Sequence, residues 1–238
     1  MALTNKLSAI GDAIREKTGK TDLITLDNMP AEILSITTSS GDTTTTDYLF
    51  INTATGSVTT ITADDFQSDK TVVGIRPFAF AGCESLTSVT LPSTISVLPY
   101  NNDIGVVGRQ FYGCIKLSEA NIANTKLPYI DDYMFYKCTS LKNITLPESI
   151  NNIYYYAFNY SGLESITIPS NVQGVYAGAF RYCEDLSTVT FNGTPSEGID
   201  PTAFTGCSSL SHIYVPWSQG TVDSAPWGAT SATIHYNS

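Results

Sequence analysis

Five cysteines occupy the same place in a phrase that the chain repeats. AFAGCESLTSVTLP at Ala79–Pro92 returns as MFYKCTSLKNITLP at Met134–Pro147, as AFRYCEDLSTVTF at Ala179–Phe191 and as AFTGCSSLSHIYVP at Ala203–Pro216. Thiols at a fixed spacing suit four roles: a metal site, a ladder of disulfides, a catalytic nucleophile or a packing position. The choice among them depends on the elements that position the thiols.

The spacing of the cysteines favours packing. Zinc sites need ligands that converge on one point, usually with close pairs such as CxxC, whereas the nearest pairs here, Cys114/Cys138 and Cys183/Cys207, are 24 residues apart. A catalytic thiol needs a base, and the chain has only two histidines. Five thiols cannot all pair, and Ser161 fills the same place once. We therefore predict buried, reduced thiols with no metal or cofactor.

A repeating unit of about 23 residues positions these cysteines. Each unit has a phenylalanine three residues before the Cys or Ser, then a leucine, then two alternating apolar residues; the phenylalanines are Phe80, Phe111, Phe135, Phe158, Phe180 and Phe204. Such a period predicts a solenoid, because one unit cannot bury its own apolar residues and stacked units can. The alternation predicts a parallel strand that points Val89 and Leu91 inward and Ser88 and Thr90 outward.

The pattern I-x-x-x-A-F-x-x-C-x-x-L-x-x-I-x-L-P resembles the BspA-type leucine-rich repeat family. That family is common in bacterial surface proteins and occurs in bacteriophage proteins. The resemblance covers Ile75–Pro216 and implies a mainly β, right-handed, curved solenoid of about six repeats. It also implies a strand on the concave face and irregular segments on the other face. The second unit departs from the pattern through an insertion at Pro99–Phe111, which predicts a local bulge.

Both ends of the repeats should be capped, because an open end would expose the core. We expect an N-terminal cap at 47–74, in which two strands flank the turn Thr55–Ser57, and a C-terminal cap at 217–238, which holds both tryptophans and the strand-like ATIHY. The repeats occupy 75–216, and 37–46 is a polar linker.

Residues 1–36 are predicted to form a separate module, which is a small pair of helices used for attachment or oligomerisation. Its first helix carries one apolar face made of Leu3, Leu7, Ile10 and Ile14. The segment LSAIGDAIREKTGKTDLITLDNMPAEILSI resembles the N-terminal segment of bacteriophage tail and fibre proteins from phages of Gram-positive hosts, and APWGATSATIHYN resembles the end of phage repeat proteins. The resemblance implies a virion appendage, in which a shared attachment segment precedes a variable distal domain.

Charge and motifs exclude several classes of function. The net charge of −10 argues against binding nucleic acid or docking on an anionic membrane. No apolar run is long enough to insert into a bilayer, and the start has no apolar core of a signal peptide. The sequence has no G-x-S-x-G, P-loop or H-E-x-x-H motif, so we expect no enzyme.

Tyrosine is the feature that points to binding. Eleven of the fourteen tyrosines lie between residues 100 and 182, outside the core columns of the repeat. Equivalent residues of stacked units lie side by side, so we expect a ridge across the middle repeats, made of Arg109, Asp131, Tyr133, Tyr136, Tyr154, Tyr156, Tyr160, Tyr176 and Tyr182. Tyrosine suits stacking on sugars and docking to protein. Shielding of the repeat edges and contact between subunits are the alternatives.

These observations predict a bacteriophage virion structural protein of the tail or fibre type, assembled in the host cytoplasm. Residues 1–46 would bind other virion proteins or form a homo-oligomer, with a trimer as one arrangement. The repeat domain would recognise a glycan or protein on the host surface. The alternatives are a bacterial cell-surface adhesin and a virion decoration protein that binds only other virion subunits.

Overall fold

The computed structural model describes residues 47–49, 58–63, 72–98 and 108–237. Three predicted regions lie wholly or partly outside these residues: the helical module with Leu3, Leu7, Ile10 and Ile14 and its linker, much of the N-terminal cap with its turn Thr55–Ser57, and most of the insertion at 99–111. The predictions made for them stay predictions.

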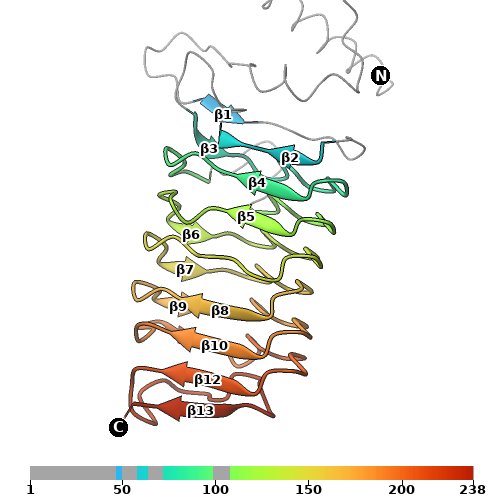
Figure 1. The fold of residues 1–238 in the computed structure, drawn as a ribbon. Coiled ribbons are helices and arrows are strands. Elements are labelled where there is room, and N and C mark those ends of the chain that lie inside the picture. The colour runs from blue at the N-terminus through green and yellow to red at the C-terminus, as the bar shows by residue number, and fades with distance from the viewer. Residues whose placement is uncertain (1–46, 50–57, 64–71, 99–107, 238) are drawn as a thin grey trace, which may run out of the picture.

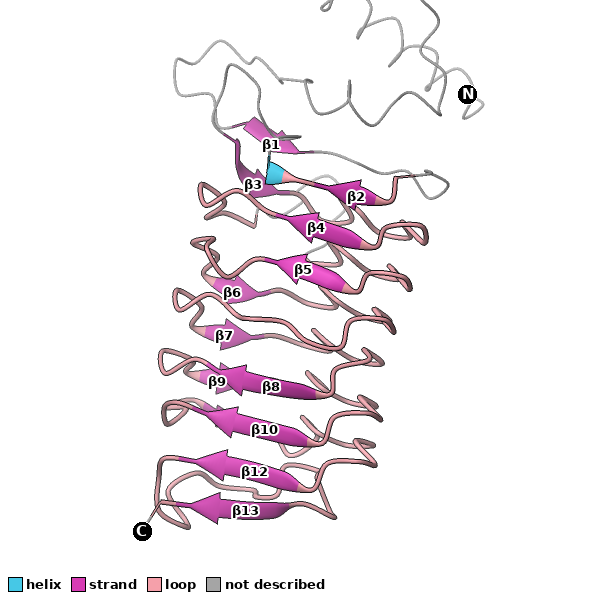
Figure 2. Ribbon diagram, viewed as in Figure 1, coloured by secondary structure: helices cyan, strands magenta, loops and turns pink. Residues whose placement is uncertain are grey.

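The described chain winds into a β-solenoid whose turns stack along one axis (Figure 1). Strands and loops make up almost all of it (Figure 2). One set of strands forms the front of the solenoid in Figure 1, and these strands pair in parallel in two sheets. The first sheet contains β2 (Thr60–Ile61), β4 (Ser88–Thr90) and β5 (Glu119–Asn121). The second contains β8 (Ser165–Ile168), β10 (Thr188–Phe191), β12 (His212–Val215) and β13 (Thr233–Tyr236).

A second parallel ladder, which we call the rear ladder, runs behind the front strands. It contains β6 (Tyr129–Ile130), β7 (Asn152–Ile153), β9 (Gly174–Val175) and β11 (Gly198–Ile199). Irregular segments were expected on this side, and over these residues the expectation was wrong. The β-branched residue five positions before each phenylalanine is the reason, because such residues favour the extended backbone and stack in register as Ile130, Ile153, Val175 and Ile199.

Both caps continue the ladders. β1 (Asp47–Leu49) pairs in parallel with β3 (Val72–Ile75), and β2 pairs in parallel with β4, so among the described residues these two N-terminal strands do not pair with each other. They add to the stack because a neighbouring turn already offers each of them an open strand edge. At the other end, the strand predicted from ATIHY forms as β13 and pairs with β12. Trp217 and Trp227 are buried, and their rings contact Phe191 of β10.

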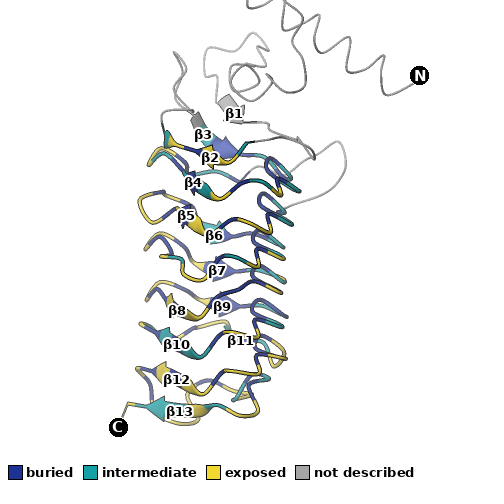
Figure 3. Ribbon diagram, turned by 45° about the vertical axis from the view of Figure 1, so that its right-hand side comes forward, coloured by how far each residue is buried: buried dark blue, intermediate teal, exposed yellow. Residues whose placement is uncertain are grey.

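A column of phenylalanine rings fills the centre of the solenoid. The six predicted phenylalanines are fully buried, and successive rings stack with centroids 5.0 to 5.3 Å apart and planes within 9° of parallel. Their backbones also join the turns, since Phe135 N donates to Ala157 O at 2.8 Å and Phe158 N donates to Ala179 O at 2.7 Å. Figure 3 shows how buried and exposed residues alternate along the chain around this core.

The cysteine column is a packing column, as predicted. All five thiols are free and buried. Four of them also donate a hydrogen bond to the carbonyl of the phenylalanine one turn earlier, as Cys114 Sγ does to Phe80 O at 3.0 Å. Ser161 joins the column with its Oγ 3.3 Å from Cys183 Sγ. Burial raises the pKa of the Cys114 thiol to about 12, so this thiol stays protonated.

The front face is interrupted in its middle. A strand was expected at Ile144–Leu146, but Asn143, Ile144 and Thr145 form no strand pairing with either neighbour, and β5 and β8 therefore belong to different sheets. The preceding unit is the one that departs from the repeat pattern. Its strand β5 has only three residues and offers Ala120 to the core where other units offer a larger side chain.

Candidate recognition surface

Five of the nine predicted surface residues lie on two tight bends next to the phenylalanines: Arg109, Tyr133, Tyr156, Tyr160 and Tyr182. The bends fall two residues before and two residues after the phenylalanine, and both place the backbone in the left-handed region. Non-glycine residues with positive φ at these places are Phe78, Arg109, Tyr133, Lys137, Tyr156, Tyr160 and Tyr182. Other turns use glycine at the same places: Gly82, Gly113, Gly178 and Gly206. Left-handed backbone costs a side-chain-bearing residue about 1–2 kcal/mol, and glycine avoids this cost.

Ring contacts join most of these residues into one continuous surface. Tyr133 stacks on Tyr156 with centroids 5.1 Å apart, and Tyr160 stacks on Tyr182 at 4.9 Å. Tyr136 connects the two stacks through edge contacts to Tyr133 at 5.6 Å and to Tyr160 at 6.0 Å. We call the connected group the tyrosine ridge: Arg109, Tyr112, Tyr133, Tyr136, Lys137, Tyr156, Tyr160, Arg181 and Tyr182.

Cations lie over the rings of the ridge. The guanidinium carbon of Arg109 lies 4.6 Å from the centroid of Tyr133, and that of Arg181 lies 4.7 Å from the centroid of Tyr182. The Lys137 amine lies 5.5 Å from the centroid of Tyr136. These distances are within the range of cation–π attraction. The ridge therefore concentrates positive charge and aromatic surface on a protein whose net charge is −10.

Two of the predicted tyrosines belong to a separate group. Tyr154 and Tyr176 contact each other with centroids 5.0 Å apart, and they pack against Tyr129 and Tyr155. No ring contact joins this group to the ridge among the described residues. A hydrogen bond to Glu197 raises the pKa of Tyr176 to about 12.

Asp131 lies beneath the surface rather than on it. Its side chain is buried, and its Oδ2 accepts a hydrogen bond from Gln110 Nε2 at 3.3 Å. Burial raises the pKa of this carboxyl above its usual range. Asp131 was grouped with the recognition residues from its place in the repeat, but the structure gives it a supporting position under the bends.

Glycines end the ridge toward the C-terminus. A Cβ on Gly178 would lie 2.5 Å from the Tyr156 ring, and a Cβ on Gly206 would lie 2.2 Å from the Tyr182 ring. Each of these rings therefore lies over a glycine of the next turn, in space that any other residue would fill. The ridge covers the middle turns and stops where the repeat returns to glycine.

Sequence reasoning missed three members of the ridge, Tyr112, Lys137 and Arg181, and the left-handed backbone. The sequence contains a signal for these positions and for their backbone conformation. Glycine and tyrosine alternate in the same alignment columns, and glycine in a repeat column marks a position that requires positive φ. Among the described residues, no group of three or more His, Cys, Asp or Glu side chains could hold a metal ion. No helix within the described ranges is long and apolar enough to cross a membrane.

Comparison with known proteins identifies the fold. The family model for the BspA type leucine rich repeat region matches residues 43–102 and 106–227 in six copies. A solved leucine-rich repeat protein from Bacteroides ovatus ATCC 8483 is 28% identical over 66% of this chain, with a TM-score of 0.53. The leucine rich repeat protein TpLRR of T. pallidum is 28% identical over 66% of this chain, with a TM-score of 0.56.

The chain spans 40% of the length of the Bacteroides protein and 70% of the length of TpLRR. A comparison with curated proteins found no match. The match to the family model covers more than half of the sequence, and the stacked phenylalanine and cysteine columns are the physical form of its repeat. The chain therefore belongs to the BspA-type leucine-rich repeat family.

Proposed function

We propose that the chain is a non-enzymatic recognition protein that binds a host-surface glycan or protein through the tyrosine ridge. One observation carries the proposal: tyrosines and other side-chain-bearing residues occupy left-handed bends that glycine fills in other turns, at Gly82, Gly113, Gly178 and Gly206. The fold does not require tyrosine there, because glycine serves the same bend in neighbouring turns. Backbone strain that the fold does not require is a sign of function.

The chemistry of the ridge supports a ligand with flat apolar faces and polar groups. Stacked tyrosines present rigid aromatic surface that loses little entropy on binding, and their hydroxyls add hydrogen bonds. Tyr160 is 39% exposed, so its ring is available to a ligand. The guanidinium groups of Arg109 and Arg181 can contact carboxylate or phosphate groups, which occur on bacterial surface polymers and on proteins.

Two kinds of protein fit this function. The resemblance of residues 1–36 to tail and fibre proteins supports a phage virion, where that module attaches or oligomerises. Membership in a family common in bacterial surface proteins supports a bacterial adhesin. A decoration protein that binds only virion subunits is the third arrangement, and it would bury the ridge between copies. Peptide mass spectrometry on purified phage particles and on washed cells of the source culture separates virion from cell surface.

Binding through the ridge is tested with fluorescently labelled full chain on a panel of whole bacterial cells and on a printed glycan array. The variant carries Tyr133→Gly, Tyr156→Gly and Tyr160→Gly, which restore the residue that other turns use. The matched control is Tyr214→Ser, because Tyr214 is equally exposed at 42% but lies on the front strand β12. We expect at least a tenfold loss of binding for the triple variant and none for the control. Unchanged binding by the folded triple variant would exclude the ridge.

A further inference from the structure

The two histidines of the chain meet on the front of the solenoid, at its C-terminal end. His212 lies on β12 and His235 on β13, 23 residues later, and the parallel pairing of these strands brings the two rings together. Nδ1 of His212 lies 3.0 Å from Nε2 of His235. The ring of Tyr214 stacks on the His235 ring with centroids 4.5 Å apart and planes 14° from parallel. This stack holds one of the two imidazoles in place.

The repeat does not require imidazoles at these positions. His212 and Tyr214 point outward from β12, because the residues between and after them, Ile213 and Val215, are buried. In the preceding strands β8 and β10, the same outward positions hold only serine and threonine, namely Ser165, Thr167, Thr188 and Thr190. His212 is exposed and His235 is half-buried. The pair is therefore an addition to the front of the last two strands, within reach of solvent.

The separation of the two nitrogens matches that of two imidazoles bound to one metal ion. A zinc ion lies about 2.0–2.1 Å from a ligating imidazole nitrogen. Two such nitrogens, at an angle of about 90–110° around the ion, are therefore about 2.9–3.4 Å apart. His212 Nδ1 and His235 Nε2 fall within this range at 3.0 Å. In the absence of an ion, one ring donates a hydrogen bond to the other over the same distance. Because His212 is exposed, a tilt of its ring can aim both lone pairs at one ion.

We propose that His212 and His235 bind one divalent transition-metal ion, such as Zn²⁺, through these two nitrogens. Neutral imidazole is a ligand that suits Zn²⁺, Ni²⁺ and Cu²⁺. When the ion enters, the proton between the rings moves to the outer nitrogen of the ring that carries it. Among the described residues, no group of three or more His, Cys, Asp or Glu side chains could hold a metal ion, so water or a bound ligand fills the remaining positions of this one. The net charge of −10 favours the approach of a cation.

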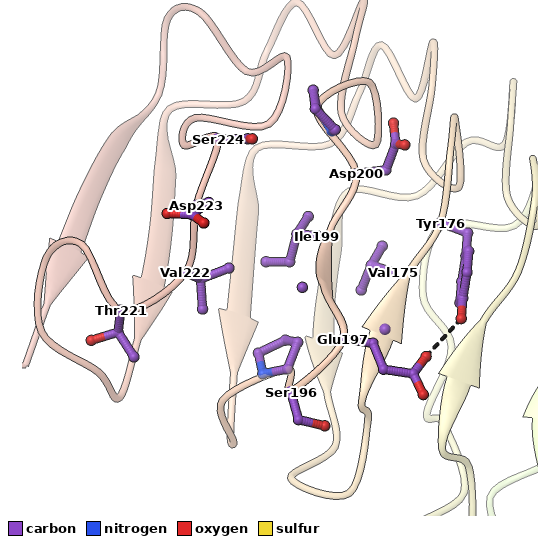
Figure 4. Close-up of a pocket in the computed structure, with 14 residues that line it drawn as sticks. Val175, Tyr176, Ser196, Glu197, Ile199, Asp200, Thr221, Val222, Asp223 and Ser224 are labelled. Atoms are coloured by element: carbon purple, nitrogen blue, oxygen red, sulfur yellow. Dashed lines mark hydrogen bonds between the residues drawn. The ribbon is translucent and has the colours of Figure 1, made fainter.

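The hollow drawn in Figure 4 offers a different set of side chains. It lies at the C-terminal end of the rear ladder and has a volume of about 490 Å³, and its lining residues include three carboxylates but no histidine or cysteine. Glu197 accepts a hydrogen bond from the Tyr176 hydroxyl, and Asp200 accepts two from Thr202. Two of the three carboxylates are thus held by protein groups. We therefore place the ion at the histidine pair and not in the hollow.

The spacing of the thiols led to the expectation of no metal, and that expectation does not cover the histidines. They come together only because β13 pairs with β12 in register, which places His235 beside Tyr214. The histidine pair shares no residue with the tyrosine ridge, so the inference does not depend on what the ridge binds.

The test is a titration of the untagged full chain with zinc chloride, followed in long-range 1H–15N NMR spectra of the imidazole rings. The chain has only two histidines, so every imidazole signal belongs to this pair. We expect one nitrogen of each ring to shift and to saturate at one equivalent of zinc. Magnesium chloride is the matched probe and should cause no shift, because Mg²⁺ prefers oxygen ligands. A zinc titration that shifts neither ring, or only one, would overturn the proposal, and so would an equal response to magnesium.

Variants locate the site. His212→Gln and His235→Gln each keep a polar side chain and remove one ligand, and we expect each to raise the dissociation constant for zinc at least tenfold in isothermal titration calorimetry. Ser165→Gln places the same amide side chain in the column of His212, two strands earlier, and should leave the affinity unchanged. Backbone amide spectra check that each variant is folded. Wild-type affinity in either histidine variant would overturn the site. The triple tyrosine variant of the ridge should bind zinc normally, so the two proposals fail separately.

Discussion

The phenylalanine column and the tyrosine ridge pass through the same turns, and some of their residues are adjacent in sequence, such as Phe135 and Tyr136. The phenylalanines recur in all six units, are fully buried and stack with planes within 9° of parallel. The tyrosines occur only in the middle turns, are partly exposed and meet at angles from 12° to 83°. A column that every turn needs is a requirement of the fold. A position that some turns fill with glycine does not need tyrosine for folding, so the tyrosines found there are available for binding.

The largest expected effect comes from the buried column. Phe158→Ala removes a ring that stacks on Phe135 and Phe180, and it leaves a cavity in a packed core. We expect the free energy of unfolding to fall by about 3–5 kcal/mol, as for other buried aromatic residues. Urea denaturation followed by circular dichroism measures the change. A loss below 1 kcal/mol would show that the column is not the main source of cohesion.

An intermediate effect is expected from the thiols at high pH. An unfolded thiol ionises near pH 9.0, whereas the buried Cys114 thiol holds its proton to about pH 12. The folded state therefore binds more protons than the unfolded state in this range, so stability is lost as the pH rises from about 9 toward 12. The slope is up to about 1.4 kcal/mol per pH unit for each such thiol.

The measurement compares urea midpoints at pH 8 and pH 10.5 for the wild type and for Cys114→Ser. Serine already occupies this column at Ser161, so the variant should fold. Its hydroxyl does not ionise in this range, and the variant should lose less stability between the two pH values. Tyrosine ionisation affects both proteins equally and cancels in the difference. Equal losses would mean that the Cys114 thiol does not contribute.

The smallest change in stability is expected for a substitution of Tyr160, two residues after Phe158. Tyr160→Gly places at φ +59° the residue that Gly82, Gly113 and Gly206 provide in other turns. Relief of about 1–2 kcal/mol of backbone strain offsets the loss of about 0.5–1.5 kcal/mol from the ring contacts. We expect the free energy of unfolding to change by less than about 1 kcal/mol. A loss above 3 kcal/mol in the same urea assay would place the ridge in the structural core.

The repeat made much of the fold predictable. The phrase around Phe80 and Cys83 gives the period, the inward residues and the thiol column, because every unit repeats the same packing problem. Features that depend on differences between units were harder to predict. The front sheet breaks near Ile144, and the buried Asp131 accepts a hydrogen bond from Gln110 of the preceding turn, and neither feature recurs from unit to unit.

The positions of the candidate site residues within the repeat could be predicted from the sequence, but their backbone conformation could not. Tyr133 and Tyr156 each lie two residues before a phenylalanine, so the repeat aligns them, and their rings stack as that alignment predicts. The left-handed bends follow from hydrogen bonds between turns, such as Tyr133 N to Tyr155 O at 3.0 Å, which involve residues far apart in sequence. The division of the tyrosines into two groups depends on ring orientations that no alignment column specifies.

The break in the front sheet between β5 and β8 has a mechanical consequence. Backbone hydrogen bonds between turns resist separation of those turns, and the front of the solenoid lacks strand pairing at Asn143–Thr145. At this level the turns are held by the phenylalanine column, by the rear ladder, which begins at β6 and continues through β11, and by isolated backbone hydrogen bonds such as Glu164 N to Lys142 O at 2.9 Å. A bending force would therefore separate the turns at Asn143–Thr145 before it separated the paired strands β8 to β13. The solenoid has a built-in point of compliance, set at the height of the tyrosines that are proposed to carry its ligand.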